Sequence, residues 1–430
     1  MKIISSIFKN IYDDTIFKNS LFLIITNFSS LAIGFFFWMV ATRLYTPGDV
    51  GVISAILSSM SLIAVISSAG LPMALTLYLP RNTKNAGNII NSSLIVAIMI
   101  SVIVSLIFLF EINIFAPKLK IILGNFGSIS IFVMTTMMTT LSLLIGGTFT
   151  AGRRSSFQMV KESIFGITKI LILIMLTGFG AIGIFISWSL GLVVAIIVGF
   201  FLMYKLWRYK PVAEFDPIIK TMTRFSIGNY IAGIFYSLPR FIFPIIIVNL
   251  ISPESAGYFF IAMTIAGLFF GIPEAVAGPF LADSSDKEKF WFNVRKALKF
   301  EMSLLIPGLF LLVIFGKFVL NLFNPNYAVN SFNSLLILSA TSIPLSLLTT
   351  FMMIRNAQKR VMSSIIVDVF VATVTIILSI PLMKLWNIEG IAISYLVANT
   401  IAATIVVLKT KNILEFTLRL IKGERIAQSN

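Results

Sequence analysis

Residues 27–80 read NFSSLAIGFFFWMVATRLYTPGDVGVISAILSSMSLIAVISSAGLPMALTLYLP, and they decide the fold. The stretch holds two apolar runs joined by the short turn Thr46-Pro47-Gly48-Asp49-Val50-Gly51. Each run is long enough to cross a bilayer, which takes roughly 20 helical residues. Pro47 cannot continue the preceding helix, and Asp49 is suited to cap the next one. The stretch therefore predicts a membrane-spanning helical hairpin.

The turn of this hairpin occurs twice. The second copy reads Ile251-Ser252-Pro253-Glu254-Ser255-Ala256-Gly257, so Pro253 follows Pro47 and Gly257 follows Gly51 by the same number of positions. A second pair of similar segments lies at nearly the same separation along the chain: GIFISW at 183–188 and GIAISY at 390–395. We interpret the chain as an internal duplication built on this hairpin.

The composition is that of an integral membrane protein. Of 430 residues, 58% are hydrophobic and 12% are charged, whereas soluble domains carry about 25% charged residues. The formal net charge of +16 is explained by basic cytoplasmic loops rather than by nucleic-acid binding. The chain has no cysteine and no histidine, which removes disulfides and the commonest zinc ligands. We expect neither a metal nor another cofactor.

Hydrophobic runs predict an all-α polytopic fold of about twelve transmembrane helices. The expected spans are 19–45, 49–79, 88–115, 127–150, 157–178, 181–206, 219–250, 255–281, 291–315, 329–354, 361–384 and 389–410. Six spans per repeat give both repeats the same orientation, so a pseudo-two-fold axis along the membrane normal should relate two six-helix lobes. We place the N-terminal lobe at 1–212, with an amphipathic segment at 1–16, and the C-terminal lobe at 213–410, followed by a basic tail at 411–430.

The distribution of lysine and arginine predicts that both termini are cytoplasmic. If the N-terminus is inside, most basic residues fall on inner segments, as the positive-inside rule requires. The outer segments then hold Arg43, Lys118, Lys120, Lys317 and Lys384.

Residues 36–80 also carry a family resemblance. The segments Ala41-Thr42-Arg43-Leu44-Tyr45, Pro47-Gly48-Asp49-Val50-Gly51 and Gly70-Leu71-Pro72 resemble the start of Wzx-type polysaccharide or oligosaccharide flippases. These belong to the multidrug/oligosaccharidyl-lipid/polysaccharide exporter superfamily. The resemblance implies a V-shaped plasma-membrane transporter that works by alternating access. It would turn a polyprenyl-phosphate-linked or pyrophosphate-linked oligosaccharide from the cytoplasmic to the outer leaflet for cell-surface glycan synthesis, alongside glycan polymerases or glycosyltransferases.

Two basic residues within spans are the first candidates for substrate binding. Arg240 lies mid-span between Pro239 and Pro244, and a guanidinium suits phosphate. In the resembled family the seventh span borders a cationic central cavity. The structural alternative is an arginine bonded to carbonyls freed by the prolines, or one that snorkels outward. Lys169 is either a second substrate cation or a lysine that snorkels along the lobe surface.

Carboxylates and amides complete the candidate set. Glu162 and Asp368 occupy matching repeat positions, which predicts either structural salt bridges or a gate or ion-coupling pair. Glu274 is a candidate for an outer gate, and Glu111 and Glu301 are weaker candidates. Asn27, Asn229 and Tyr230 offer hydrogen bonds to sugar hydroxyls, or to neighbouring helices.

Two other function classes remain open. One is a drug or small-molecule antiporter of the same superfamily, which would favour carboxylates in the cavity. The other is a membrane enzyme of polysaccharide assembly, but the short segments between spans argue against an enzyme. The sequence leaves open the glycan, the lipid carrier, the coupling ion and the oligomeric state.

Overall fold

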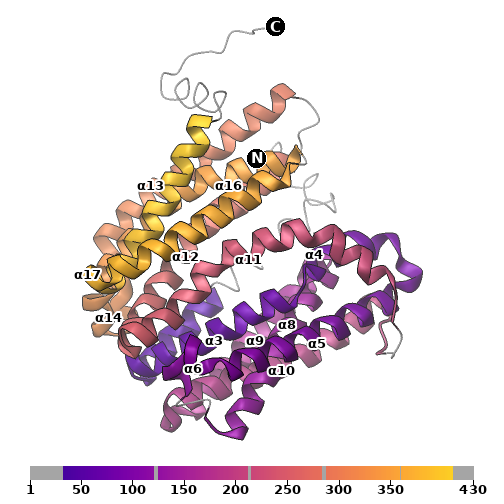
Figure 1. Ribbon diagram of the computed structural model, residues 1–430, viewed down its shortest axis with the longest axis horizontal. Coiled ribbons are helices and arrows are strands. Elements are labelled where there is room, and N and C mark those ends of the chain that lie inside the picture. Colours follow the sequence, from indigo (N-terminus) through magenta and orange to yellow (C-terminus); the bar gives the residue numbers. More distant parts are fainter. Residues whose placement is uncertain (1–31, 121–123, 212–214, 283–286, 359, 410–430) are drawn as a thin grey trace, which may run out of the picture. The chain divides into compact units, whose positions relative to one another are not determined.

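Helices, most of them long, form nearly all of the described part of the protein (Figure 1). The structure is a computed structural model that describes residues 32–120, 124–211, 215–282, 287–358 and 360–409. The predicted amphipathic segment 1–16, Asn27 and the tail 411–430 lie outside these residues. Among the described residues, nine helices are long and apolar enough to cross a membrane, and Ala32–Leu44 is a shorter apolar helix.

Each of the twelve predicted spans coincides, in its described part, with one helix or with consecutive helices, as at 49–79, 88–115 and 329–354. Two of the predicted spans are not counted separately when spanning helices are identified by hydropathy alone. One is α9 (Ser155–Met175), which carries Lys161, Glu162 and Lys169. The other lies in α17 (Val361–Lys409), which joins two helices across a kink at Trp386 and Asn387. The prediction of an all-α polytopic membrane protein is therefore confirmed.

Contacts divide the chain into two compact units, which we describe separately. Unit 1 comprises residues 1–265 and 315–332, and unit 2 comprises 266–314 and 333–430. The three boundaries fall inside α12 (Pro253–Ala282), inside α13 (Lys287–Phe323) and at the first residue of α15 (Phe332–Ala340). Because these units follow contacts rather than the repeat, the predicted lobe boundary at 212 stays a prediction.

Unit 1 is a bundle whose helices run alongside one another (Figure 1). Beside Ala32–Leu44 it contains α3 (Pro47–Ser67), α4 (Leu71–Tyr78), α5 (Ala86–Phe110), α6 (Ile112–Phe115), α8 (Phe126–Ala151), α9, α10 (Gly180–Trp207), α11 (Ile218–Leu250) and α14 (Pro325–Asn330). Four single 3-10 turns connect them, at Leu79–Arg81, Thr83–Asn85, Pro117–Leu119 and Thr177–Phe179. The closest helix pairs are α9 with α10 and α3 with α11. A core of buried aliphatic side chains from α4, α5, α8 and α10 holds the bundle together.

Unit 2 packs α16 (Ser342–Ala357) against α17, with α15 (Phe332–Ala340) preceding them. Its core includes Leu348 and Phe351 from α16 and Ala402, Ala403 and Val406 from α17. The unit-2 part of α12 joins this packing, because Phe270 makes an edge contact with Tyr395 of α17.

The turn that opens α3 is closed by a capping box. Thr46 is the N-cap and accepts a hydrogen bond from the Asp49 backbone N–H, while an Asp49 carboxylate oxygen accepts one from the Thr46 backbone N–H. The expectation that Asp49 itself caps α3 is corrected, since Pro47 at the first helical position makes Thr46 the N-cap and Asp49 the third residue. In the second copy Ser252 occupies the place of Thr46 and accepts from the Ser255 backbone N–H.

The two copies of the turn pack against each other within unit 1. A Cβ added to Gly51 would lie 1.7 Å from the carbonyl oxygen of Pro253, and one added to Gly257 would lie 2.4 Å from that of Pro47. Each glycine thus allows the backbone of the other copy to approach where no side chain would fit. The contact is reciprocal, as a pseudo-two-fold axis requires.

The backbone also repeats at the predicted outer turn between the last two spans of each half. Gly180 begins α10 with φ 53° and ψ −144°, and Asn387 in the kink of α17 has φ 48° and ψ −131°. Gly183 and Gly390, three residues further on, both lie against a leucine carbonyl: that of Leu176, which caps the end of α9, and that of Leu382 before the kink of α17. The duplication read from sequence is therefore present in the backbone geometry.

Candidate substrate-binding site

Lys169 lies in the interior of unit 1, inside a cage of aromatic rings. Its Nζ lies 4.5 Å from the ring centre of Phe37, 4.4 Å from that of Phe165 and 4.1 Å from that of Trp188. The rings come from helix Ala32–Leu44, α9 and α10. Lys169 is only 4% exposed, and Gly191 of α10 makes room for it, because an added Cβ there would lie 2.9 Å from the Lys169 Cβ. The cage stabilises the buried ammonium through cation–π contacts.

Glu162 lies two turns before Lys169 on α9, in a polar network. Its Oε1 is 3.0 Å from the Lys161 Nζ and accepts a hydrogen bond from Gln158 at 2.9 Å. The fully buried Lys161 also donates to the Ser142 hydroxyl of α8 at 2.7 Å. Glu162 thus has a salt-bridge partner on its own helix, and the choice between a structural and a gating role stays a prediction.

Arg240 is exposed on α11, ten residues before the end of that helix, while its neighbour Pro239 is buried. Its guanidinium makes no hydrogen bond or ion pair with any described residue. The structure does not bring Arg240 and Lys169 together, since one lies on a helix surface and the other in the bundle interior.

Tyr230 and Asn229, the two polar candidates on α11, have different surroundings. The Tyr230 hydroxyl donates to the carbonyl of Ile66 in α3 at 2.5 Å, so it holds two helices together. Asn229 is partly exposed and is a hydrogen-bonding group left on the surface of α11.

The carboxylates of unit 2 lie in unlike environments. Asp368 is 6% exposed on α17 and makes no hydrogen bond with a described residue, in contrast to its repeat mate Glu162. Glu274 is exposed on α12. Glu301 on α13 is fully buried and accepts a hydrogen bond from Ser346 of α16, while its Oε1 has no hydrogen-bond partner among the described residues. Glu301 was only a weak candidate from sequence, since it lies two residues after Lys299 and the sequence there gives no sign of burial.

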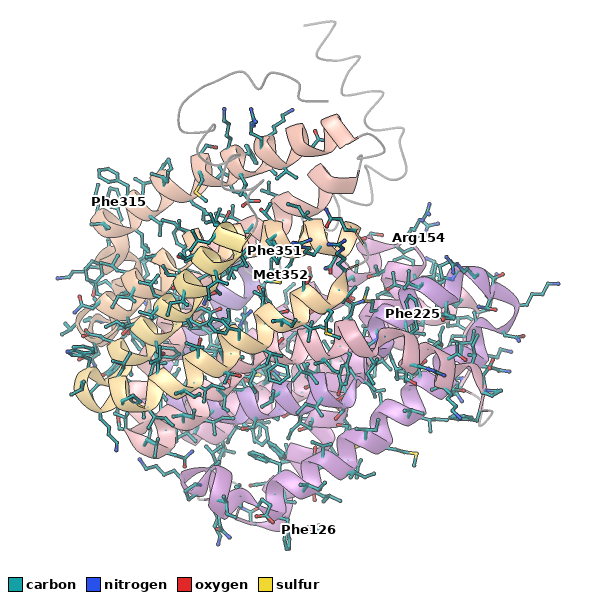
Figure 2. The ribbon with its side chains drawn as sticks, turned by 45° about the horizontal axis from the view of Figure 1, so that its top comes forward. Phe126, Arg154, Phe225, Phe315, Phe351 and Met352 are labelled. Carbon is teal, nitrogen blue, oxygen red and sulfur yellow. The ribbon has the colours of Figure 1, made fainter. Side chains whose placement is uncertain are left out.

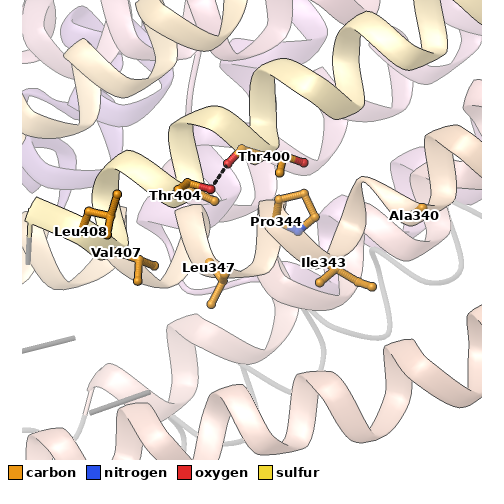
Figure 3. Close-up of a pocket in the computed structure, with 9 residues that line it drawn as sticks. Ala340, Ile343, Pro344, Leu347, Thr400, Thr404, Val407 and Leu408 are labelled. Carbon is orange, nitrogen blue, oxygen red and sulfur yellow. Dashed lines mark hydrogen bonds between the residues drawn. The ribbon is translucent and has the colours of Figure 1, made fainter. Parts of the chain in front are cut away.

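An apolar groove of about 510 Å³ runs between α16 and the end of α17 (Figure 3). Its lining consists of Ala340, Ile343, Pro344, Leu347, Thr400, Ala403, Thr404, Val407 and Leu408. Both threonine hydroxyls donate to carbonyls of their own helix. The groove suits hydrocarbon and offers no charge to a phosphate.

The aromatic cage was the main feature that sequence reasoning missed. The i, i+4 spacing of Phe165 and Lys169 was a visible signal, because such residues share a helix face. The contributions of Phe37 and Trp188 were not visible, since they depend on how three separate helices pack.

Solved structures show which fold the chain has. It resembles an inward-facing multidrug resistance MATE family transporter of the MOP superfamily, with TM-score 0.73 and 15% identity over 89% of this chain and 94% of the other. It resembles the lipid II flippase MurJ in an inward closed conformation with TM-score 0.71 and 15% identity over 95% and 94%. A MATE protein in its straight conformation gives TM-score 0.63 and 16% identity over 93% and 95%.

Sequence comparisons show the family. A search of curated proteins found no match. The model of one family, described as polysaccharide biosynthesis protein, matches residues 16–284, which is more than half of the chain. The structural relatives named above are transporters and a flippase, and they share the fold of this chain. The chain belongs to the polysaccharide biosynthesis protein family and is a multi-pass membrane protein with the fold of these solved transporters.

Proposed function

We propose that this protein turns a polyprenyl-phosphate-linked or pyrophosphate-linked oligosaccharide from the cytoplasmic to the outer leaflet of the plasma membrane, with both termini in the cytoplasm. The observation that carries the proposal is Arg240, an exposed guanidinium ten residues inside the end of α11 and without a partner among the described residues. Ten helical residues span about 15 Å, so Arg240 would lie deep in a membrane whose outer surface meets the end of α11. A guanidinium there is costly in lipid and favourable beside a phosphate.

The family supports an anionic, lipid-linked substrate. Its description is polysaccharide biosynthesis, and one solved relative is a lipid II flippase. Asn229 would meet sugar hydroxyls. The apolar groove beside α17 offers nothing to the phosphate, and Lys169 is enclosed in its aromatic cage apart from Arg240, so the phosphate would depend on Arg240.

If transport is coupled to an ion, Asp368 is a better candidate for the coupling residue than Glu162. Glu162 already has Lys161 and Gln158 as partners, whereas Asp368 is buried without one among the described residues. A buried carboxylate without a partner favours binding a cation or a proton. Glu274, exposed on α12, stays a candidate for the gate. Unchanged pH and sodium dependence of translocation in Asp368→Asn would remove the coupling role.

The test of the proposed function is translocation of lipid-linked oligosaccharide in vesicles. Arg240→Ala and Arg240→Glu should each lower the rate at least tenfold, while Arg240→Lys should retain part of it, because lysine keeps the charge but loses the bidentate geometry. Arg224→Ala is the matched control, since it removes an exposed arginine from the opposite end of the same helix. Normal translocation by both Arg240→Ala and Arg240→Glu would refute the phosphate-binding role.

The drug antiporter is the second candidate function, and the buried acids Asp368 and Glu301 favour it. Proton- or sodium-driven export of an organic cation by the wild-type protein, together with no movement of lipid-linked oligosaccharide, would select it.

A further inference from the structure

Two arginines occupy backbone positions that normally belong to glycine. Arg153 follows α8 with φ 52°, and Arg208 follows α10 with φ 52° and ψ 28°. The left-handed residue after a helix is usually glycine, because a side chain is strained there. Gly152 precedes Arg153 but has φ −78°. That glycine serves packing instead, since an added Cβ would lie 2.6 Å from the Leu206 side chain.

The two helix ends lie next to each other. The Trp207 indole N–H donates to the carbonyl of Thr148 at 3.2 Å, so the last turns of α8 and α10 are in contact. The basic residues at these ends are all exposed, and none forms a salt bridge with a described residue; they are Arg153, Arg154, Lys205, Arg208 and Lys210. Figure 2 shows the Arg154 side chain pointing away from the helices. We call these five residues the basic edge.

An exposed apolar stripe on α10 leads to the basic edge. Leu190 is 46%, Ile197 64%, Phe201 65% and Tyr204 45% exposed, and their spacing puts them on one face of the helix. Arg208 lies four positions beyond Tyr204, one turn further on. The surface thus offers hydrocarbon contact along a membrane-spanning helix and positive charge where that helix ends.

We propose that the basic edge and the apolar stripe of α10 bind an anionic glycerophospholipid of the surrounding bilayer. Its phosphate would lie between Arg153 and Arg208, and its acyl chains would lie along Ile197 and Phe201. This occupant matches both halves of the surface, because acyl chains need the stripe and the phosphate needs the cations. A soluble anion would use only the charges. The site is separate from Arg240 and Lys169, and it does not depend on the proposed substrate.

Because Arg153 and Arg208 have left-handed backbones, glycine can replace both without destabilising the fold, so loss of lipid binding can be told apart from unfolding. Replacing both Arg153 and Arg208 by glycine removes two charges and relieves both left-handed positions, so the purified variant should melt at a higher temperature than the wild type in neutral detergent. Added phosphatidylglycerol should raise the wild-type melting temperature more than phosphatidylcholine does. In the double glycine variant this difference should fall by at least half, and native mass spectrometry should show fewer retained phosphatidylglycerol molecules.

Two further variants separate charge from other effects. The double lysine variant Arg153→Lys with Arg208→Lys should keep the phosphatidylglycerol response. The control Lys317→Ala with Lys384→Ala removes two exposed cations elsewhere and should also keep it. A full response in the double glycine variant would overturn the proposal. A wild-type response to polyprenyl phosphate that exceeds the one to phosphatidylglycerol, and that is lost in the glycine variant, would assign the site to the substrate lipid instead.

Discussion

Gly51 lies directly against the carbonyl of Pro253, so closely that an added Cβ would be 1.7 Å from the oxygen. Its repeat mate Gly257 meets the carbonyl of Pro47 in the same way. Other contacts at this end of unit 1 join segments predicted to lie on the outer side. The Arg43 Nε donates to the carbonyl of Leu322 at 2.6 Å, and the Lys118 backbone N–H donates to the Asn249 side chain at 3.0 Å. In an alternating-access transporter such a contact would act as an outer gate, because it must open to release substrate.

Alanine at Gly51 or Gly257 should therefore prevent this end from closing. The new methyl group would overlap a backbone oxygen, which cannot move without shifting a helix. We expect translocation to fall at least tenfold in Gly51→Ala, with labelling of a cysteine at Gly48 by an aqueous thiol reagent increased. The chain has no cysteine, so that label is specific.

Gly233→Ala is the control, because an added Cβ at Gly233 meets nothing within 4 Å. That variant should translocate normally and gain up to about 1 kcal/mol in helix stability. Normal translocation by both Gly51→Ala and Gly257→Ala would mean that the turns do not form a gate.

The sequence revealed this duplication but not the contact between its copies. Equal spacing of Pro47, Gly51, Pro253 and Gly257 shows that two segments are alike, and it does not show where they lie in space. The positions of most spans were predictable because hydropathy is a local property, whereas α9 and the second helix within α17 are not counted by hydropathy alone. The cage around Lys169 and the burial of Glu301 were not, since both depend on packing between helices. Pro239 and Pro244 drew attention to Arg240 in the sequence, and both lie in the same helix as Arg240. They did not show whether the Arg240 side chain would be exposed.

Asp49 should stabilise two helices at once. One carboxylate oxygen closes the capping box of α3, and the other accepts a hydrogen bond from the Ala181 backbone N–H at the start of α10, at 3.0 Å. Asp49→Ala removes both contacts and should lower stability by about 1 to 3 kcal/mol, seen as a lower melting temperature in detergent. Asp49→Asn keeps only one acceptor oxygen, so its melting temperature should lie between those of the wild type and Asp49→Ala. A wild-type melting temperature in Asp49→Ala would show that the double cap contributes nothing.

Asn387 should be a strained position that glycine relieves. It has φ 48° and ψ −131°, while the matching residue of the first repeat is Gly180. A non-glycine residue in this region costs on the order of 1 to 3 kcal/mol, so Asn387→Gly should raise the melting temperature. Asn387→Ala removes the side chain without relieving the backbone and should not. The reverse change, Gly180→Asn, should destabilise, and stabilisation in that variant would contradict the assignment.

We expect Lys169 to prevent an organic cation from binding in its aromatic cage. In the wild type the cage is filled by the Lys169 ammonium, with three ring centres 4.1–4.5 Å from Nζ. Lys169→Ala empties a space bounded by Phe37, Phe165 and Trp188, which is the arrangement that recognises quaternary ammonium ions. We expect this variant to bind tetramethylammonium at least tenfold more tightly than the wild type in calorimetric titrations, since a desolvated cation–π site contributes about 2 kcal/mol.

Two controls separate cage binding from general loosening of the bundle. Lys169→Met fills the space with a neutral chain of similar length and should not bind the ion. Lys161→Ala removes the other buried lysine of α9, whose Nζ bonds the Ser142 hydroxyl, so it opens no aromatic site. If Lys169→Ala binds no more tightly than these two variants, the rings close over the vacated space and Lys169 does not exclude organic cations. If it does bind, the lysine itself keeps the aromatic cage in the N-terminal half of the chain from accepting organic cations.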